Sequence, residues 1–331
     1  MPTSERADPE KCHRYMQLTE KIYQSLFKDI LKGRFLPGQR FLTENEAMQR
    51  FGASRTTIRR AFAKLVDNHA ILRKQKVGSI VNTKLAASEG KISKIAAILP
   101  IEDHFVRSFL STLCNEAAKR DVITVLEPGS SGQQQNEAVI RLALHGIRDM
   151  VVWGIDRTLD LELFFRLRIL GVNMVFFDRI NPGKIADYVC LDNAGAMRAL
   201  FEKAKERGIR RVYFVDPTGL DIDSNHERLQ CCRKECAAHG IDFSTELPEI
   251  FPEHSAIFAV NDPTALMFAE CGVPVFSIDG LPESRAKGII SYRQPMDELA
   301  KGCFKSLGDQ RRLGENWKAR QYRFLAQDPF A

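Results

Sequence analysis

Short apolar runs alternate with amphipathic segments from Ile92 to the end of the chain. The runs are typical of buried strands, and the segments between them repeat apolar residues at helical spacing. This alternation predicts parallel sheets covered by helices on both faces. About 240 residues of the pattern fit two lobes better than one sheet. The expected strands are 95–99, 122–126, 150–153, 173–177, 188–191, 211–215, 256–260, 273–278 and 288–291, and the expected helices are 108–119, 133–144, 160–170, 194–206, 225–238, 263–269 and 296–307.

A different pattern occupies residues 39–82. Thr43 and Glu46 have the T-x-x-E spacing of a capping box, which predicts the start of a helix. A turn follows, and Ser54 is placed to cap a second helix. Residues 71–81 then form a basic segment that predicts a β-hairpin. Helix, turn, helix and hairpin together indicate a winged helix-turn-helix.

The second helix of this segment has one polar face and one apolar face. Its apolar residues Ile58, Phe62 and Leu65 recur at helical spacing, so they are expected to point inward. Hydroxyls and guanidiniums at the start of a helix can reach phosphates and base edges in a major groove. The side chains expected to be exposed there are Arg55, Thr56, Thr57, Arg59 and Arg60.

The charge distribution supports DNA binding by this segment. Residues 11–85 hold 16 Lys/Arg and five Asp/Glu, a net charge of +11, whereas the whole chain has +6 and the remainder therefore −5. A concentrated basic domain on a mildly acidic body is the pattern of phosphate binding. A solvated charged face, or a helix-turn-helix that binds protein rather than DNA, are the alternatives.

No apolar run approaches the length of a membrane span, and the polar first residues are not expected to be a secretion signal. The eight cysteines lack C-x-x-C spacing and are expected to be reduced, in a cytoplasmic protein. We expect no metal site and no cofactor. The expected domains are a disordered leader (1–16), a DNA-binding domain (17–82), a polar linker (83–91) and an effector-binding and dimerisation domain (92–331).

Residues 17–82 resemble the GntR-type winged helix. The matching segments are Pro37-Gly38, Thr43-Glu44-Asn45-Glu46-Ala47, Phe51-Gly52-Ala53-Ser54-Arg55-Thr56-Thr57-Ile58-Arg59 and Gly78. The sequence departs from the family at Asn45, where some members carry a DNA-contacting Arg, and at Lys76, which is often Gly. The resemblance implies operator contacts from the second helix and the wing. The expected DNA-binding residues are Thr43, Asn45, Ser54, Arg55, Thr56, Thr57, Arg59, Arg60, Lys76 and Gly78.

Polar and aromatic side chains follow the expected strands of the second part. Ligands of open α/β sheets bind beyond the carboxyl ends of the strands. Carboxylates, amides and guanidiniums there can bond vicinal hydroxyls, and an aromatic face can stack on a sugar ring. Each such residue could instead cap a helix. The residues singled out by position are His104, Phe105, Arg107, Trp153, Asp178, Arg179, Asn261 and Asp279.

Residues 92–310 resemble the effector domain of LacI/GalR regulators, which share a two-lobed fold with periplasmic sugar-binding proteins. The matching segments are 177–179, 189–196, 227–229, 259–262, 278–279 and 291–295. The resemblance implies that Arg228, Asn261 and Asp279 contact ligand from one lobe, and that Asp178 and the 104–107 loop face them. Only about a dozen residues (244–255) precede the strand at 256–260, so the C-terminal lobe is expected to be trimmed.

A winged helix joined to a LacI-like body is the arrangement of arabinose-repressor-like regulators. We therefore expect a homodimeric repressor that binds a near-palindromic operator in double-stranded DNA and is controlled by a sugar or polyol. One alternative is a DNA-binding regulator whose body binds no sugar and serves dimerisation or a protein partner. An enzyme fused to a DNA-binding domain is a further alternative, but no nucleophile elbow, P-loop or H-E-x-x-H motif is present.

Overall fold

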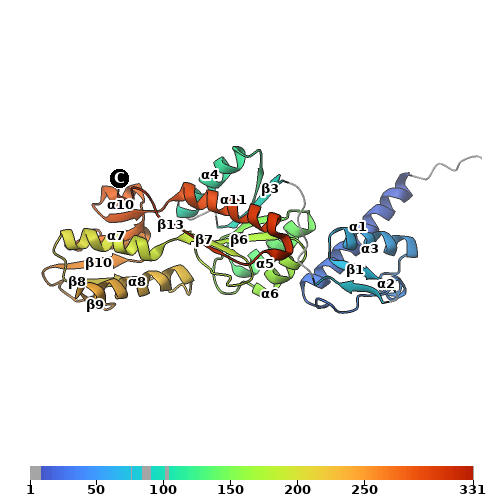
Figure 1. Cartoon of the computed structure of the whole chain (residues 1–331), viewed down its shortest axis with the longest axis horizontal. Coiled ribbons are helices and arrows are strands. Elements are labelled where there is room, and N and C mark those ends of the chain that lie inside the picture. The colour runs from blue at the N-terminus through green and yellow to red at the C-terminus, as the bar shows by residue number, and fades with distance from the viewer. Residues whose placement is uncertain (1–8, 76, 84–90, 101–103, 331) are drawn as a thin grey trace, which may run out of the picture.

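The computed structural model describes residues 9–75, 77–83, 91–100 and 104–330, with side chains from Met16 onward except that of His104. Figure 1 shows three bodies in a row: an N-terminal domain, a first lobe in the middle and a second lobe at the far end. Among the described residues, no helix has the length and apolar character needed to cross a membrane.

The N-terminal domain is the expected winged helix. Three helices precede a two-stranded antiparallel hairpin in which Ile71 pairs with Val81 and Lys74 with Gly78. Helix α1 begins at Pro9, so the part of the expected disordered leader that the structure describes is helical. The elements are α1 (Pro9–Leu31), α2 (Glu44–Phe51), α3 (Arg55–Asp67), β1 (Ile71–Lys74) and β2 (Gly78–Val81).

The first lobe is a six-stranded sheet in the order β13-β7-β6-β5-β3-β4, and all its pairings are parallel. Strands β3, β5, β6 and β7 are buried almost throughout, as expected of strands covered on both faces, whereas the edge strands β4 and β13 carry partly buried and exposed residues. Its elements are β3 (Lys94–Leu99), α4 (His104–Ala118), β4 (Ile123–Pro128), α5 (Gly132–Leu144), β5 (Asp149–Val152), α6 (Leu161–Ile169), β6 (Asn173–Phe177), β7 (Asp187–Leu191), α11 (Met296–Leu313), the 3-10 turn Gly314–Asn316 and β13 (Gln321–Phe324).

The second lobe is a five-stranded parallel sheet in the order β12-β11-β10-β8-β9. Its elements are α7 (Asn193–Glu206), β8 (Arg211–Val215), α8 (Asp223–His239), β9 (Asp242–Ser244), β10 (Ser255–Ala259), α9 (Asp262–Leu266), β11 (Val275–Asp279), α10 (Pro282–Ala286) and β12 (Ile290–Arg293). The fold class is therefore as predicted: a winged helix followed by two parallel α/β lobes.

The trimmed part of the second lobe lies between β9 and β10. The chain crosses from one side of β8 to the other without a helix. Phe251 in this crossover packs edge-on against Tyr213 of β8, with ring centroids 5.5 Å apart. One aromatic side chain therefore covers sheet surface that a crossover helix ordinarily covers.

Two elements link the lobes in ways that the sequence pattern did not predict. Helix α11 follows the last strand of the second lobe but packs against β6 and β7 of the first. Strand β13 then pairs with β7, after which the chain returns to the second lobe, where Phe330 packs against Tyr292. The chain thus crosses between the lobes three times, near residues 192, 295 and 325.

The N-terminal domain packs directly on the first lobe. Arg166 of α6 donates to the carbonyl oxygen of Leu31 over 2.6 Å, and Arg148 donates to the Asn68 side chain over 2.6 Å. Buried residues of α1 and of α5 belong to one continuous apolar cluster. The two bodies therefore share a core.

Candidate DNA-binding surface and interlobe cleft

Helix α3 and its cap residue present half of the ten expected DNA-binding side chains. Ser54 caps the helix by accepting a hydrogen bond from the Thr57 amide over 3.2 Å. Residues Ile58, Phe62 and Leu65 are buried, as their spacing predicted. Of the expected DNA-binding residues on and beside the helix, the exposed ones are Ser54, Arg55, Thr56, Arg59 and Arg60.

Thr57 corrects one expectation. Its side chain is only 2% exposed and lies 2.8 Å from the Ser54 hydroxyl. A threonine at this position completes the cap at the start of α3 rather than facing solvent, because it lies one turn from Ser54 on the inward side. Thr57 therefore supports the recognition helix and does not offer a surface for DNA.

Glu44 is a residue that the motif reading matched but gave no role. Its carboxylate accepts from Arg59 Nε over 3.0 Å and lies 4.0 Å from Arg55 Nε. The neighbouring Asn45 accepts from Arg55 Nη2 over 3.1 Å. The first two residues of α2 therefore hold two guanidiniums of α3 at the surface where DNA binding is expected.

The remaining expected DNA contacts flank this surface. The capping box at Thr43 and Glu46 is formed, so the Thr43 hydroxyl is engaged at the start of α2. Gly78, the first residue of β2, is exposed and has φ +93°, a conformation that favours glycine. Arg73 and Lys74 of β1 are exposed on the same hairpin, and Lys76 lies outside the described residues.

A cleft of about 320 Å³ lies between the two lobes at the carboxyl ends of their strands. Of the expected ligand-binding residues, seven line it: Phe105, Trp153, Asp178, Arg179, Arg228, Asn261 and Asp279. Arg107 does not, because it lies two residues beyond Phe105 on α4 and is exposed on another face. The side chain of His104 lies outside the described part of the chain. Sequence reasoning missed Ser224, Asn225 and Glu283, which also line the cleft and lie at the starts of α8 and α10.

Arg228 of α8 is the central cation of the cleft, and it is 4% exposed. It donates to Asn193 Oδ1 over 3.0 Å and to the carbonyl oxygen of Val260 over 2.8 Å. Its Nη2 lies 4.0 Å from Asp178 Oδ1, across the cleft on the first lobe. A buried guanidinium of the second lobe thus faces a carboxylate of the first.

Asp178 has an unused acceptor. Its Oδ2 accepts from Trp153 Nε1 over 3.4 Å, while Oδ1 is buried and, within the described part of the chain, accepts no hydrogen bond. Asp178 also has φ +63°, a sparsely populated conformation that functional sites often hold. Beside it, the Arg179 guanidinium lies over the Trp153 ring, 3.7 Å from the centroid.

Asp279 at the end of β11 is the second acidic group of the cleft. Desolvation is the main cause that raises its pKa to about 7; Arg228 opposes the shift and the nearby Asp262 adds to it. Its carboxylate accepts from the Asp262 amide over 3.2 Å and from Gln294 Nε2 over 3.0 Å. Its φ of +149° is a strained value for a residue with a side chain.

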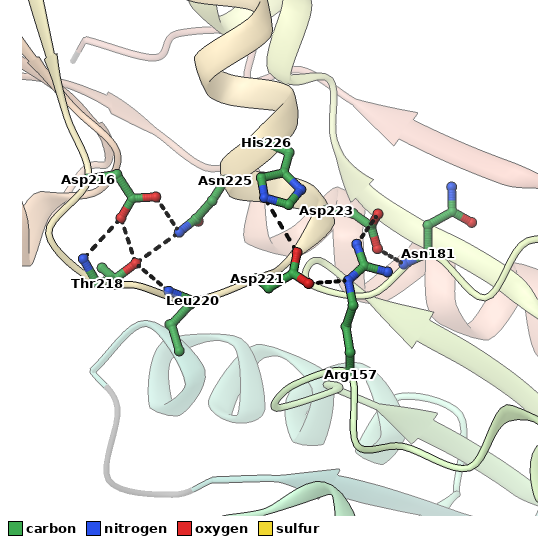
Figure 2. Close-up of polar contacts among 9 residues, drawn as sticks. All are labelled: Arg157, Asn181, Asp216, Thr218, Leu220, Asp221, Asp223, Asn225 and His226. Atoms are coloured by element: carbon green, nitrogen blue, oxygen red, sulfur yellow. Dashed lines mark hydrogen bonds and ion pairs between the residues drawn. The ribbon is translucent and has the colours of Figure 1, made fainter. Parts of the chain in front are cut away.

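Polar contacts join the lobes at one side of the cleft (Figure 2). Arg157 of the first lobe pairs with Asp221 and Asp223 of the second, each at 3.1 Å. Asp223 also accepts from the backbone amide of Asn181 over 2.9 Å, and its own amide donates to the Arg179 carbonyl oxygen. We call Arg157, Asp221 and Asp223 the interlobe latch, because the three side chains hold the two lobes together.

The cysteines whose side chains the structure describes are all free thiols. Among the described residues, no group of three His, Cys, Asp or Glu side chains has metal-binding geometry. Burial raises the pKa of Cys190 to about 12 and raises the pKa values of Cys232 and Cys303, so these thiols stay protonated.

The N-terminal domain matches a known protein family. Residues 18–81 match the family model described as bacterial regulatory proteins, gntR family. The N-terminal domain is a gntR-type DNA-binding domain. The chain is accordingly a DNA-binding regulator of transcription.

The two lobes match solved structures in fold. One is a periplasmic binding protein/LacI transcriptional regulator from Alkaliphilus metalliredigens QYMF complexed with D-xylulofuranose (16% identity, 70% of this chain and 96% of that chain, TM-score 0.56). Another is the lac repressor dimer bound to operator and the anti-inducer ONPF (15% identity, 70% of this chain and 91% of that chain, TM-score 0.57). A third is the periplasmic binding protein component of the arabinose ABC transporter from Shewanella sp. ANA-3, bound to L-arabinofuranose (15% identity, 70% of this chain and 90% of that chain, TM-score 0.59). The second part thus has the fold shared by LacI regulators and periplasmic binding proteins.

Proposed function

We propose that the chain is a repressor whose operator affinity is controlled by a monosaccharide or small polyol bound in the interlobe cleft. The observation that carries this proposal is the buried Asp178 Oδ1, which faces the Arg228 guanidinium at 4.0 Å but accepts no hydrogen bond in the described part of the chain. Buried polar atoms are almost always hydrogen-bonded, so such an oxygen in a cleft calls for a donor from a ligand. A hydroxyl group supplies one.

The rest of the cleft suits a polyhydroxylated ligand. Asp279 and Asn261 offer acceptors from the second lobe, and Trp153 and Phe105 offer aromatic faces from the first. A volume of about 320 Å³ is at the small end of ligand pockets, which favours one sugar ring over an oligosaccharide. The sugars named in two of the similar structures support the same class.

Dimerisation through the first lobe is also part of the proposal. Among the strands that the structure describes, β4 pairs with β3 alone and lies at the edge of the sheet, and its Ile123 is 61% and Leu126 41% exposed. Exposed apolar edges of this kind invite a partner. A second copy meeting β4 and the adjacent α4 would bring two recognition helices to two half-sites, as a near-palindromic operator requires. We place this regulator in the cytoplasm.

A thermal-shift screen of monosaccharides, polyols and sugar phosphates tests ligand control. A compound that binds only the folded protein at 100 times its Kd stabilises it by about 2.7 kcal/mol. Asp178→Asn should abolish the shift, while Asp297→Asn, an exposed residue at the start of α11, should keep it. A flat response in the wild type would leave a regulator whose body serves dimerisation or a protein partner.

Selection of binding sites from random DNA tests the other half of the proposal. Enriched sequences should be inverted repeats with half-sites about one helical turn apart. Arg59→Ala should weaken binding to them by about 1–3 kcal/mol if Arg59 contacts bases. Arg198→Ala removes an exposed cation on α7 of the second lobe and should leave binding unchanged.

A further inference from the structure

A second cavity lies at the opposite end of the first lobe from the interlobe cleft. It measures about 590 Å³ and is bounded by α11, by Arg120 two residues beyond the end of α4, and by the residues that lead into β3 and β4. Since those residues precede the strands, the cavity lies at the amino ends of the sheet. We call it the basic groove.

Cations and apolar side chains make up this groove. Its charged lining residues are Lys91, Arg120, Lys301, Lys305, Arg311 and Arg312, and among the described residues no Asp or Glu lines it. Ile92, Val122 and Phe304 form an apolar floor. The chain outside residues 11–85 carries a net charge of −5. Six cations around one cavity are therefore a local concentration of positive charge on an otherwise acidic part of the chain.

Three of these cations already have acidic partners. Arg120 pairs with Glu116 and lies over the Phe304 ring, Arg311 pairs with the buried Asp149, and Arg312 pairs with Asp309. In the part of the chain that the structure describes, Lys91, Lys301 and Lys305 lie within ion-pair distance of no carboxylate. The groove therefore keeps uncompensated positive charge.

Helix α11 shapes the groove through its residue spacing. Lys301, Lys305, Gly308 and Arg312 follow one another at intervals of four, three and four, so they share one helix face. At Gly308, a Cβ atom would meet nothing within 4 Å. The glycine thus leaves open space between the cations.

We propose that the basic groove binds a small phosphorylated molecule that carries an apolar portion, as a second effector site. The lysines and Arg312 would bind the phosphate groups, since Lys and Arg are the phosphate-binding cations of proteins. The floor of Ile92, Val122 and Phe304 would cover the apolar portion.

The groove adjoins the contact between the first lobe and the DNA-binding domain. Arg311 pairs with Asp149, and the preceding residue, Arg148, donates to Asn68 at the end of α3. A phosphate that draws Arg311 toward the groove weakens its hold on Asp149, one residue from that contact. The site is thus placed where an effector can bias the position of the DNA-binding domain.

Titration calorimetry on the full chain tests the proposal, with ADP and inorganic pyrophosphate as probes and sulfate at equal ionic strength as the control anion. The wild type should bind ADP saturably and more tightly than pyrophosphate. Gly308→Glu adds a carboxylate at a position where a Cβ atom meets nothing within 4 Å, and it should weaken ADP binding at least tenfold, whereas Gly308→Ala should bind as the wild type does. Lys301→Gln with Lys305→Gln should reproduce the loss.

The DNA-binding domain is itself basic and can attract polyanions, so the variants decide the location. Equal ADP binding by the wild type and Gly308→Glu would place the probe elsewhere and overturn the proposal. Equal affinities for ADP, pyrophosphate and sulfate would reduce the groove to an unspecific cationic surface. If the protein bound a poly-glutamate peptide saturably but did not bind ADP, the proposal of a small phosphorylated ligand would be overturned in favour of an acidic protein segment. Arg228→Met in the interlobe cleft should leave ADP binding unchanged, which separates this site from the proposed sugar site.

Discussion

Replacing Asp279 by asparagine should make the protein more stable at neutral pH, by an amount that grows as the pH rises. The pKa of this carboxyl is raised from 3.8 to about 7, chiefly by desolvation. Well below pH 3.8 the group is protonated in both the folded and the unfolded protein. Between pH 4 and 7 the unfolded state loses its proton more readily, so the free energy of unfolding falls as the pH rises. At 1.36 kcal/mol per pKa unit, the loss is about 4 kcal/mol at most.

The hydrogen bonds around Asp279 show that an amide can take its place. Gln294 Oε1 is buried and, within the described residues, has no partner, while Gln294 Nε2 donates to Asp279. If the Gln294 amide turns over, Oε1 can accept from the amide nitrogen of the introduced asparagine, whose oxygen still accepts from the Asp262 amide. The same turn serves a protonated Asp279, so the substitution imitates the neutral form.

Urea unfolding followed by circular dichroism, repeated from pH 5 to pH 8, measures the effect. We expect the difference between Asp279→Asn and the wild type to rise with pH and to level off above pH 7. Asp297→Asn, an exposed residue of α11, serves as the control and should follow the wild type. Parallel pH profiles for Asp279→Asn and the wild type would refute the assignment of a neutral carboxyl to the folded protein.

Three further predictions test how the bodies are held together. Arg157→Gln removes both ion pairs of the interlobe latch, each worth about 0.2–1 kcal/mol at this exposure. Because these pairs hold the two lobes together, the radius of gyration of the ligand-free protein should increase. Lys203→Gln, which breaks an ion pair within α7, should not increase it. Arg148→Ala removes the hydrogen bond to Asn68 and should raise hydrogen exchange at the end of α3; unchanged exchange would show that the apolar cluster alone holds the domain. Phe251→Ala should lower the free energy of unfolding by about 2 kcal/mol, while Ile250→Ala, 84% exposed, should change it by under about 0.5 kcal/mol.

Local signals in the sequence predicted local structure well. The capping box at Thr43 and the cap at Ser54 are both formed, because each depends on residues within one helical turn. Strands such as 173–177 and 211–215 were predicted to the residue, because a buried parallel strand is a continuous apolar run bounded by polar residues. The parallel sheets were predicted from the alternation of such strands with amphipathic helices along the chain.

Long-range packing was outside the reach of such signals. Strand β13 has a half-exposed pattern and pairs with β7, more than 130 residues earlier, so nothing near it in the sequence indicates its partner. Arg157 lies in a polar loop and meets its aspartates only once the two lobes are assembled. Thr57 was predicted to be exposed together with Arg55 and Thr56, but it is buried. A sequence motif gives the order of residues and does not show which side of the helix each one occupies.

The shared core between the DNA-binding domain and the first lobe has a consequence for regulation. If the domain moved freely on residues 83–91, closing the cleft could change its position only through that short segment. Instead α1 packs against α5, and Arg166 of α6 holds the carbonyl oxygen at the end of α1. Helix α6 follows the loop that carries Arg157 and Trp153 to the cleft and the latch. On the proposed function, a ligand that shifted this loop would act on α6, and through Arg166 on α1, so that differential binding to open and closed lobes would reach the recognition helix through packed elements.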